Sequence, residues 1–310
     1  MRRRQILVAL LATPWAAWAL ARTLAIDTFH PAVALMSLTP IAAATAIVPV
    51  LAALALREWI VAGVAALALT ALAVAVLPRA LDGPHHAGAG AAGRTLVVMS
   101  ANLLYGRADV HDVLRLVREH DVDVLSLQEL TSEALARLDA AGARELLPGR
   151  ALRPQPRAAG NGLMARRRLD DVAETGPDRR VVQASLDDLR IAAVHPYPPI
   201  AAASVREWHA VLDALPGPFD GSRAHLLIGD FNATLDQRAL RRLLDAGYTD
   251  AADATGDGLV ATFPVGDPWP VVTIDHVLVP RTVGVRRFSA HDVEGSDHRA
   301  IVAELVLGPA

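Results

Sequence analysis

The residues best suited to chemistry in this 310-residue chain are acids, amides and imidazoles that stand at the ends of short apolar runs. Strands that pack together can bring such ends to one rim, which is how enzymes built on sheets assemble a site. One polar residue in such a place is usually a turn or a helix cap, but seven of similar chemistry are hard to explain that way. The seven are Asn102, Glu129, His195, Asp230, Asn232, Asp275 and His298.

These residue types suit the hydrolysis of a phosphate ester assisted by a hard divalent cation. Mg²⁺ prefers a few carboxylates together with water and substrate oxygens, and Mn²⁺ accepts the same kind of site. A phosphate ester carries negative charge, which a metal ion and imidazolium groups neutralise while water attacks. An aspartate beside a histidine fixes the tautomer of the ring and raises its pKa. An aspartate two residues from an asparagine can accept the proton of the water while the amide holds a phosphate oxygen.

Other catalytic mechanisms find no support in the sequence. Cysteine is absent, so the chain has no thiolate nucleophile and no disulfide, and any metal must be held by oxygen or imidazole. Neither a GxSxG elbow nor a Walker A loop occurs. The chemistry is therefore expected to depend on the acids, amides and histidines.

The elements that must position these residues alternate along the chain after Thr95. Segments with apolar residues at helical spacing alternate with short apolar runs, and no internal repeat is visible. We expect helices over residues 110–120, 204–215 and 235–246. We expect strands over residues 96–100, 122–127, 181–185, 190–195, 225–229, 274–279, 283–288 and 300–306.

Eight short motifs, in a fixed order, resemble those of the endonuclease/exonuclease/phosphatase superfamily, the Mg²⁺-dependent phosphohydrolases similar to DNase I. The resemblance covers roughly Leu96 to Leu307. Each motif is weak evidence alone, but the shared order is specific. The motifs are Ser100-Ala101-Asn102, Leu127-Gln128-Glu129, Gly160-Asn161-Gly162 followed by Arg166, Val194-His195, Gly229-Asp230-Phe231-Asn232, Thr262-Phe263-Pro264, Ile274-Asp275-His276 and Ser296-Asp297-His298.

The resemblance implies a fold of the α/β (α+β) class. Two mostly antiparallel sheets would pack face to face with helices outside, which makes a four-layer αββα sandwich. It also implies a metal site, with Glu129 as the main Mg²⁺ ligand and Asn102 and Asp297 as further ligands. Asn102 would in addition contact the substrate.

Roles in the reaction are implied for five further residues. Asp230 and Asn232 would orient and activate the attacking water, and Asn232 would also bind the substrate. His298 would contact a phosphoryl oxygen, with its ring held by Asp275. His195 would contact another phosphate oxygen.

Some residues near these motifs are expected to have no catalytic role. Many relatives carry arginine just before the Ile-Asp-His motif, but this chain has Thr273, so one phosphate contact is missing. His276 should point to the opposite face of its strand from Asp275 and is expected to be structural. The basic runs Arg166–Arg168 and Arg179–Arg180 could meet an anionic ligand, although a solvated surface is the favoured interpretation.

The first 78 residues differ in composition from the rest of the chain. Hydrophobic residues make up 53% of the whole sequence and charged residues 20%, against about 45–50% and about 25% in a typical soluble domain. The excess lies before Arg79, because only four charged residues occur between Arg4 and that position. This composition excludes a wholly soluble protein, a disordered chain and a disulfide scaffold. The four residues are Arg22, Asp27, Arg57 and Glu58.

Three uncharged stretches, residues 5–21, 28–56 and 59–78, make up this N-terminal region. About 20 apolar residues cross a bilayer as a helix. We therefore predict a membrane domain over residues 1–78 with about three transmembrane helices, the second kinked by its prolines. The first stretch also fits a cleaved secretory signal peptide, because arginines precede it and small residues end it.

The arginines predict the orientation of the chain in a cell membrane. Arg2-Arg3-Arg4 and Arg57 should stay in the cytoplasm, so three spans place the C-terminal domain outside, as do two spans if the first stretch is cleaved. Residues 79–94 are rich in Gly, Ala and Pro and are expected to form a flexible linker of roughly 20 Å. The catalytic domain, residues 95–310, would then stay close to the bilayer.

The sequence thus predicts a membrane-anchored Mg²⁺-dependent phosphohydrolase. Its partners would be the lipid bilayer and a phosphomonoester, phosphodiester or diphosphate, possibly lipid-linked, at the outer membrane surface. This layout resembles a bacterial subgroup of membrane-bound members linked to glycopeptide-antibiotic resistance. The substrate, the bond cleaved and the oligomeric state stay open.

Two other functions compete with this prediction. The first alternative is an extracytoplasmic Mg²⁺-dependent endonuclease or exonuclease on the same scaffold. From Arg94 onward the chain has 24 arginines against 30 acidic residues, so tight nucleic-acid binding is not expected. The second alternative is a non-catalytic binding domain, which a full set of site residues disfavours.

Overall fold

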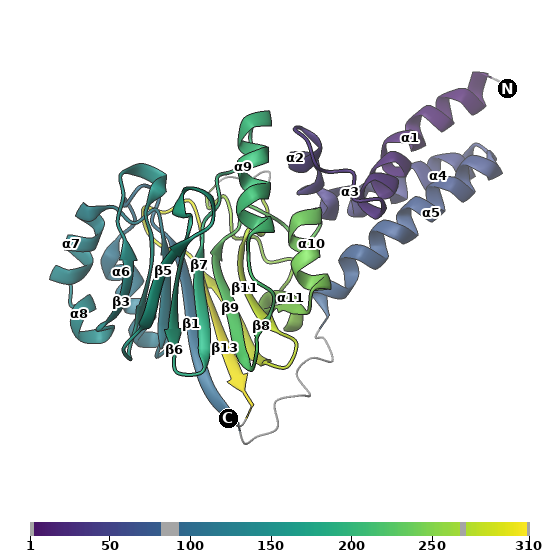
Figure 1. Ribbon diagram of the computed structural model, residues 1–310. Helices are drawn as coiled ribbons and strands as arrows, with labels where there is room; N and C mark the ends of the chain where they lie inside the picture. The colour runs from purple at the N-terminus through teal and green to yellow at the C-terminus, as the bar shows by residue number, and fades with distance from the viewer. Residues whose placement is uncertain (1–2, 82–92, 267–270, 309–310) are drawn as a thin grey trace.

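A computed structural model of the protein describes residues 3–81, 93–266 and 271–308, which form a helical N-terminal part and a two-sheet sandwich (Figure 1). The N-terminal part begins with a long helix, continues through three short ones and ends with a second long helix. A single 3₁₀ turn, η1, then leads toward the sandwich. The elements are α1 (Arg3–Thr23), α2 (Ala32–Met36), α3 (Thr39–Thr45), α4 (Ile47–Ala55), α5 (Trp59–Val76) and η1 (Leu77–Ala80).

The two long helices run in the same direction. Arg4, near the start of α1, pairs with Glu58 just before α5, at 3.0 Å between Nε and Oε1. At their other ends, Arg22 and Arg79 both reach Asp236 of the sandwich. The segment from α3 to α4 therefore leads back between the two ends, and it packs against α5. The N-terminal part is a helical bundle in which the α3–α4 segment runs antiparallel to α1 and α5 (Figure 1).

The expected second transmembrane helix, over residues 28–56, is wrong as a single helix. Proline has no N–H to donate and is tolerated only in the first turn of a helix. Pro40 stands in the first turn of α3 and begins a new helix there. Pro49 stands in the first turn of α4, which only the helical residue Ala46 separates from α3, so Pro49 kinks the Thr39–Ala55 helix as expected. In the described residues, α1 and Trp59–Ala80 are the two helices long and apolar enough to cross a membrane, and Thr39–Ala55 is a shorter apolar segment.

The bundle is packed through small side chains and exposes large ones. Ala12, Ala53 and Ala65 are buried where the helices meet, whereas Leu7 and Leu67 are 67% and 73% exposed. In soluble domains large apolar side chains are preferentially buried, and small residues at helix contacts are typical of membrane helices. Only 17% of the apolar window of α1 and 28% of that of α5 are buried, so neither is a core helix of the sandwich.

The first sheet of the sandwich has six strands in the order β12-β13-β1-β2-β4-β3. Its centre is the parallel pair β1 and β2, and the other neighbours are antiparallel. The strands are β1 (Arg94–Asn102), β2 (Val124–Gln128), β3 (Gly149–Arg153), β4 (Asn161–Ala165), β12 (Gly284–His291) and β13 (Ala300–Leu307).

The second sheet has the order β10-β11-β9-β7-β6-β5, with the short β8 paired to β9. Here β7 and β9 form the parallel pair. The strands are β5 (Asp170–Thr175), β6 (Val181–Leu186), β7 (Leu189–Val194), β8 (Phe219–Asp220), β9 (Arg223–Asp230), β10 (Tyr248–Asp250) and β11 (Asp275–Pro280).

Helices cover the outer faces of both sheets, which confirms the predicted αββα sandwich (Figure 1). α6 (Val110–Glu119), α7 (Ser132–Ala140) and α8 (Ala143–Leu146) lie on the first sheet. α9 (Ala202–Asp213) and α10 (Arg238–Asp245) lie on the second. Short turns complete the fold: η3 (Arg157–Ala159), η4 (Pro177–Arg179) and α11 (Ala251–Ala254).

Alternation along each strand divides the core into layers, because successive side chains point to opposite faces. Val98 of β1 and Ile228 of β9 face the space between the sheets. Their neighbours Met99 and Leu227 face the outer helices. Central strands are therefore apolar on both faces, which explains why their sequence runs are continuous rather than alternating.

Two buried polar side chains join the sheets directly. Ser126 of β2 donates its hydroxyl to the carbonyl of Ile228, at 3.1 Å. Asn161 of β4 donates its amide to the carbonyls of Ala193 and Arg180, at 2.9 and 3.1 Å. These hydrogen bonds fix the offset of one sheet against the other.

The expected linker over residues 79–94 overlaps ordered elements at both ends. Arg79 belongs to η1 and is 6% exposed, and Arg94 begins β1. Residues 82–92 lie outside the described part of the chain.

Replacing Asn161 should weaken the joint between the sheets. Asn161→Ala removes three buried hydrogen bonds, two of them between the sheets, and leaves a small cavity, so we expect the free energy of unfolding to fall by about 2–4 kcal/mol. Denaturant unfolding of the detergent-solubilised chain, followed by tryptophan fluorescence, measures this. Gln183→Ala on β6, at a partly exposed position, is the control and should change the free energy by less than about 0.5 kcal/mol. Equal effects of the two variants would contradict the assignment.

Candidate active site

The predicted site residues come together at one edge of the sandwich. The parallel strands β1, β2, β7 and β9 all end there, because their carboxyl ends point the same way, and the antiparallel strands β11 and β13 begin there. This placement follows from topology, since the residues are far apart in sequence. Asn102 and Asp230 end β1 and β9, Asp275 begins β11, Glu129, His195 and Asn232 follow β2, β7 and β9, and His298 precedes β13.

Asp230 lies at the centre of the cluster and is 2% exposed. Its Oδ2 accepts the amide of Asn102 at 3.1 Å, and its Oδ1 accepts the backbone N–H of Asn232 at 2.8 Å. Burial raises the pKa of Asp230 from 3.8 to about 7; the carboxylate of Asp275 adds to this, while His298 opposes it. A carboxyl group that titrates near neutral pH is suited to accept a proton from water.

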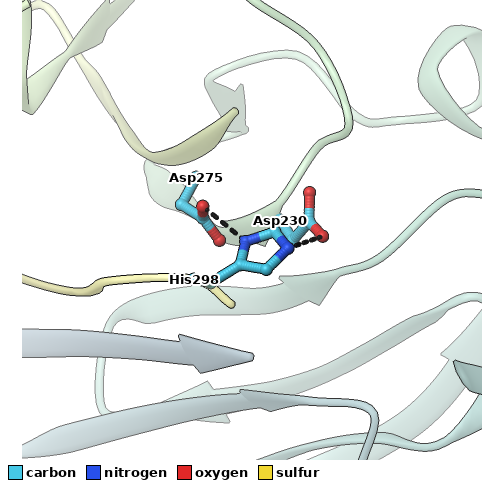
Figure 2. Close-up of side chains that lie close together, drawn as sticks. All are labelled: Asp230, Asp275 and His298. Atoms are coloured by element: carbon cyan, nitrogen blue, oxygen red, sulfur yellow. Dashed lines mark hydrogen bonds and ion pairs between the residues drawn. The ribbon is translucent and has the colours of Figure 1, made fainter. Parts of the chain in front are cut away.

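His298 is held between two carboxylates (Figure 2). Its Nδ1 lies 2.9 Å from Oδ2 of Asp275, and its Nε2 lies 3.8 Å from Oδ2 of Asp230. Asp275 and Asp230 are directly opposite each other in the β11–β9 pair, which places both on one side of the sheet. Burial alone would lower the pKa of His298, but the two carboxylates raise it to about 10. The ring is therefore an imidazolium, with N–H groups for Asp275 and for an oxyanion.

His195 also approaches Asp230 and has the opposite charge state to His298. Its Nε2 is 3.7 Å from Oδ2 of Asp230, and the residue is 3% exposed. Burial, then the charges of Arg180 and His298, lower the pKa of His195 to about 3, so the ring is neutral. No other described residue bonds its buried Nδ1. The ring thus has a free polar atom within the site.

Arg180 is a residue that the sequence interpretation placed on the solvated surface, and for this residue the expectation is wrong. The side chain is 4% exposed. Its Nη1 donates to the carbonyl of Ala158 at 2.8 Å, and its guanidinium carbon lies 3.5 Å from the ring centre of Tyr197. The neighbouring Arg179 is exposed, as expected. A pair of adjacent arginines gives no sequence signal of which one is buried.

His276 faces away from the site, on the opposite side of β11. Its Nδ1 lies 2.8 Å from Oδ2 of Asp250, and its Nε2 lies 2.8 Å from the carbonyl of Ala233. Burial opposes its charge, but Asp250 raises the pKa of His276 above 6.5, so both ring nitrogens donate. The ring therefore holds Ala233, the residue that follows Asn232.

The residues at Glu129 fit a divalent cation. Oε2 of Glu129 accepts the backbone N–H of Tyr105 at 2.5 Å, and the residue itself has a positive φ of 56°. Burial raises the pKa of Glu129, and the nearby carboxylate of Asp297 raises it further. Two carboxylates and the amide of Asn102 so close together form an oxygen-rich group whose negative charge a hard cation would neutralise.

Asp230, Asp275 and His298 form a second group with atoms close enough to hold a metal, all within 4.8 Å of one another (Figure 2). Both nitrogens of His298 face carboxylates, however, and a protonated ring is not a ligand. Charge therefore favours Glu129, Asn102 and Asp297 as the cation site. This leaves the Asp275–His298 pair for proton and oxyanion contacts.

Several supporting residues were not predicted as parts of the site. Trp208 of α9 donates its indole N–H to the carbonyl of Phe231 at 3.0 Å, which holds the segment between Asp230 and Asn232. The ring of Phe263 lies 4.7 Å from that of His298, measured between ring centres. Aromatic residues of this kind resemble ordinary core residues in a sequence, because only the fold brings them to the site.

Comparison with known proteins agrees with this geometry. The profile of the Endonuclease/Exonuclease/phosphatase family matches residues 99–298, most of the sandwich. The chain belongs to this family, whose members hydrolyse phosphoester bonds and typically depend on a divalent metal. A search among curated proteins gave no match.

Solved structures share the fold of the sandwich. A 3′ phosphatase, NExo, from Neisseria, bound to a product DNA hairpin, is 18% identical over 67% of this chain and 98% of its own, with a TM-score of 0.54. An AP endonuclease from Archaeoglobus fulgidus is 14% identical over 67% of this chain and 98% of its own, with a TM-score of 0.53. An endonuclease/exonuclease/phosphatase from Beutenbergia cavernae is 20% identical over 70% of this chain and 72% of its own, with a TM-score of 0.51.

The metal assignment is tested at Glu129. Glu129→Gln keeps the shape of the side chain but removes its charge, so we expect turnover at saturating Mg²⁺ to fall by at least ~10²-fold and Mg²⁺ binding to weaken. Phosphate release and calorimetric titration measure the two effects, and EDTA should abolish the wild-type activity. Glu133→Gln, at an exposed position of α7, is the matched control. Full activity of Glu129→Gln would refute the assignment.

The proton and oxyanion contacts are tested by three variants. Asp230→Asn and His298→Ala should each lower kcat by at least ~10²-fold, the usual scale for losing a positioned proton acceptor or an oxyanion donor. Asp275→Asn should be milder, because His298 keeps its place beside Asp230. His111→Ala, on the exposed face of α6, is the control. A silent His298→Ala together with a severe Asp275→Asn would show that the pairing has another purpose.

Proposed function

We propose that this protein is a membrane-anchored Mg²⁺-dependent phosphohydrolase that acts on a phosphate ester or diphosphate borne by a lipid. The observation that carries the hydrolytic part is Asp230, a buried carboxyl group that titrates near pH 7 between a neutral His195 and a protonated His298. In this group, Asp230 can accept a proton from an attacking water, and the two histidines can contact phosphate oxygens.

The residues divide the work according to their charge states. Asp230 accepts the proton of the water that attacks phosphorus, while the amide of Asn232 holds the phosphate. His298 donates from Nε2 to a phosphoryl oxygen as negative charge grows there, and Asp275 keeps its ring in place. His195, being neutral, contacts a second phosphate oxygen. Mg²⁺ at Glu129, Asn102 and Asp297 would supply further neutralisation of the phosphoryl charge.

The membrane part of the proposal is supported by the bundle. α1 has 21 residues, and at 1.5 Å per residue this is roughly 30 Å, the thickness of the apolar core of a bilayer. The bundle exposes many large apolar side chains, such as Leu7 and Leu67, and buries small ones, such as Ala12 and Ala65, which suits lipid surroundings better than water. The returning segment from Thr39 to Ala55 is shorter but also apolar.

We infer an external position of the sandwich from the charges at the two ends of the bundle. With α1, the α3–α4 segment and α5 each crossing the bilayer, the start of α1 and the end of α5 lie on opposite sides of it. At the start of α1, Arg2-Arg3-Arg4 and Arg57 give an excess of positive charge, whereas Arg22 and Arg79 at the other end are both paired with Asp236. The positive end is the one expected in the cytoplasm.

Nuclease activity is the competing proposal. Two of the similar structures are a 3′ phosphatase bound to a DNA hairpin and an AP endonuclease. Against this activity, the catalytic part has more acids than arginines, and DNA binding depends on basic surface.

A substrate screen on the purified full chain decides between these proposals. Mg²⁺-dependent phosphate release should be detected with lipid diphosphates or phospholipid phosphates in mixed micelles, and single- and double-stranded DNA should be cleaved at least ~10-fold more slowly. Asp230→Asn serves as the inactive control for every substrate. Preferential cleavage of DNA would replace the lipid proposal by the nuclease proposal.

Protease treatment of whole cells tests the orientation. If the sandwich lies outside, added protease should degrade it on intact cells, because only a bilayer would protect it. A tag at the N-terminus should survive until the membrane is permeabilised. Immunoblots against both ends measure this. Survival of the sandwich on intact cells, with degradation once the membrane is permeabilised, would place it in the cytoplasm and would exclude an outer-leaflet substrate.

A further inference from the structure

Asp236 joins the membrane bundle to the sandwich through a buried ion cluster. Its side chain has no exposed surface. Arg79 donates Nη1 and Nη2 to its two oxygens at 2.8 and 2.6 Å, and Arg22 donates Nε to Oδ1 at 2.6 Å. A two-pronged arginine–carboxylate contact is strong and fixes direction as well as distance. Both long helices of the bundle thus end on one carboxylate.

Neighbouring residues extend this junction, which we call the Asp236 clamp and define as Asp236, Gln237, Arg22 and Arg79. Gln237 donates Nε2 to the carbonyl of Val33 in α2 at 2.8 Å and to the hydroxyl of Ser37 at 3.1 Å. Val33 itself is fully buried among the residues of α9 and α10. The bundle is therefore docked into the sandwich and not merely tethered to it.

The clamp stands on the segment that carries the catalytic residues. Asp236 is six residues after Asp230 and four after Asn232, whose positive φ of 48° is a conformation that needs support. Oε1 of Gln237 accepts the backbone N–H of Thr234 at 2.7 Å. The side chain of Gln237 thus holds this loop with its oxygen and the bundle with its nitrogen.

Other contacts in the same place come from the bundle as well. Asp27 accepts the backbone N–H of Arg238 at 2.7 Å, where α10 begins. Arg241 of α10 donates to the carbonyl of Arg22 at 2.6 Å. Both edges of the loop that follows Asn232 are therefore held, on one side by the catalytic cluster and on the other by the bundle.

We infer that the membrane bundle is part of the active-site scaffold, with Asp236 as a positioning residue that sets the loop of Asn232 through Arg22, Arg79 and Gln237. If the two arginines are removed, the carboxylate of Asp236 is left buried without a partner of opposite charge, and the loop must shift to hydrate it. The displaced loop would carry Asn232 out of register with Asp230. Chemistry on any substrate, soluble or lipid-borne, would then slow.

The inference is tested on the full chain in detergent with Arg79→Gln, Arg22→Gln with Arg79→Gln, Arg79→Lys and Asp236→Asn. The control is Arg168→Gln, which breaks the surface pair with Asp170. Backbone hydrogen exchange of residues 231–237 should quicken at least ~10-fold in the double variant and less in Arg79→Gln. Arg79→Lys, which keeps the charge but not the two-pronged contact, should quicken exchange less than Arg79→Gln. Peptides from β4 should be unchanged, which shows that the variants are folded.

Kinetics supply the second readout, with bis(p-nitrophenyl) phosphate as a soluble probe. The double variant and Asp236→Asn should lower kcat about 10-fold and also raise KM, because Asn232 on this loop both orients the attacking water and holds the phosphate. This arm depends on the proposed hydrolytic function, whereas the exchange arm does not. If the wild type turns over no phosphate ester, the proposed function fails and the exchange result still decides the inference.

Unchanged exchange of residues 231–237 overturns the inference, and so does a loss of thermal stability with kcat unchanged. A variant that unfolds would show fast exchange in β4, and the milder Arg79→Gln then decides.

Discussion

The structure depends on the burial of one carboxylate, Asp230, at the edge where two sheets meet. A buried carboxylate must be hydrogen-bonded or paired. Here the amide of Asn102 from the first sheet and the backbone of Asn232 from the second both donate to it. It can be satisfied only when the sheets have closed in the correct offset. The same closure that stabilises the fold therefore assembles the site.

Asp236, at the other end of the same loop, is a second buried carboxylate that must be paired. Its partners come from the N-terminal helical bundle instead of from a sheet, but it needs partners for the same reason, since an isolated buried charge is costly. Eight residues, from Asp230 to Gln237, thus connect the catalytic cluster to α1, α2 and η1. A flexible linker would not produce such contacts. The position of the sandwich relative to the bundle is set by specific partners.

Much of this could be predicted from the sequence, and the failures have a common cause. Apolar runs with an acid, amide or histidine at one end identified β1, β2, β7, β9, β11 and β13, because central strands are buried on both faces. Edge strand β5, with the sequence DDVAET, is mostly exposed and lacks that pattern. The burial of Arg79 and Arg180 was also missed, because a charged residue is normally solvated and its partners are distant in sequence. The helix expected over residues 28–56 was predicted to kink at its prolines, and the structure divides it further into α2, α3 and α4.

The two histidines beside Asp230 show how far local context decides chemistry. In both histidines Nε2 lies just under 4 Å from Oδ2 of Asp230. Both rings are buried, and burial by itself lowers the pKa of each. They differ in their second neighbour. His298 has Asp275 at Nδ1, and the pKa rises to about 10, whereas His195 has Arg180 nearby, and the pKa falls to about 3. His298 therefore donates from both ring nitrogens, whereas His195 carries one ring proton and can donate from one nitrogen and accept at the other. Such a pair suits a phosphate whose oxygens differ in charge. The protonated His298 can donate to the more negative oxygen, and the neutral His195 can contact a less negative one.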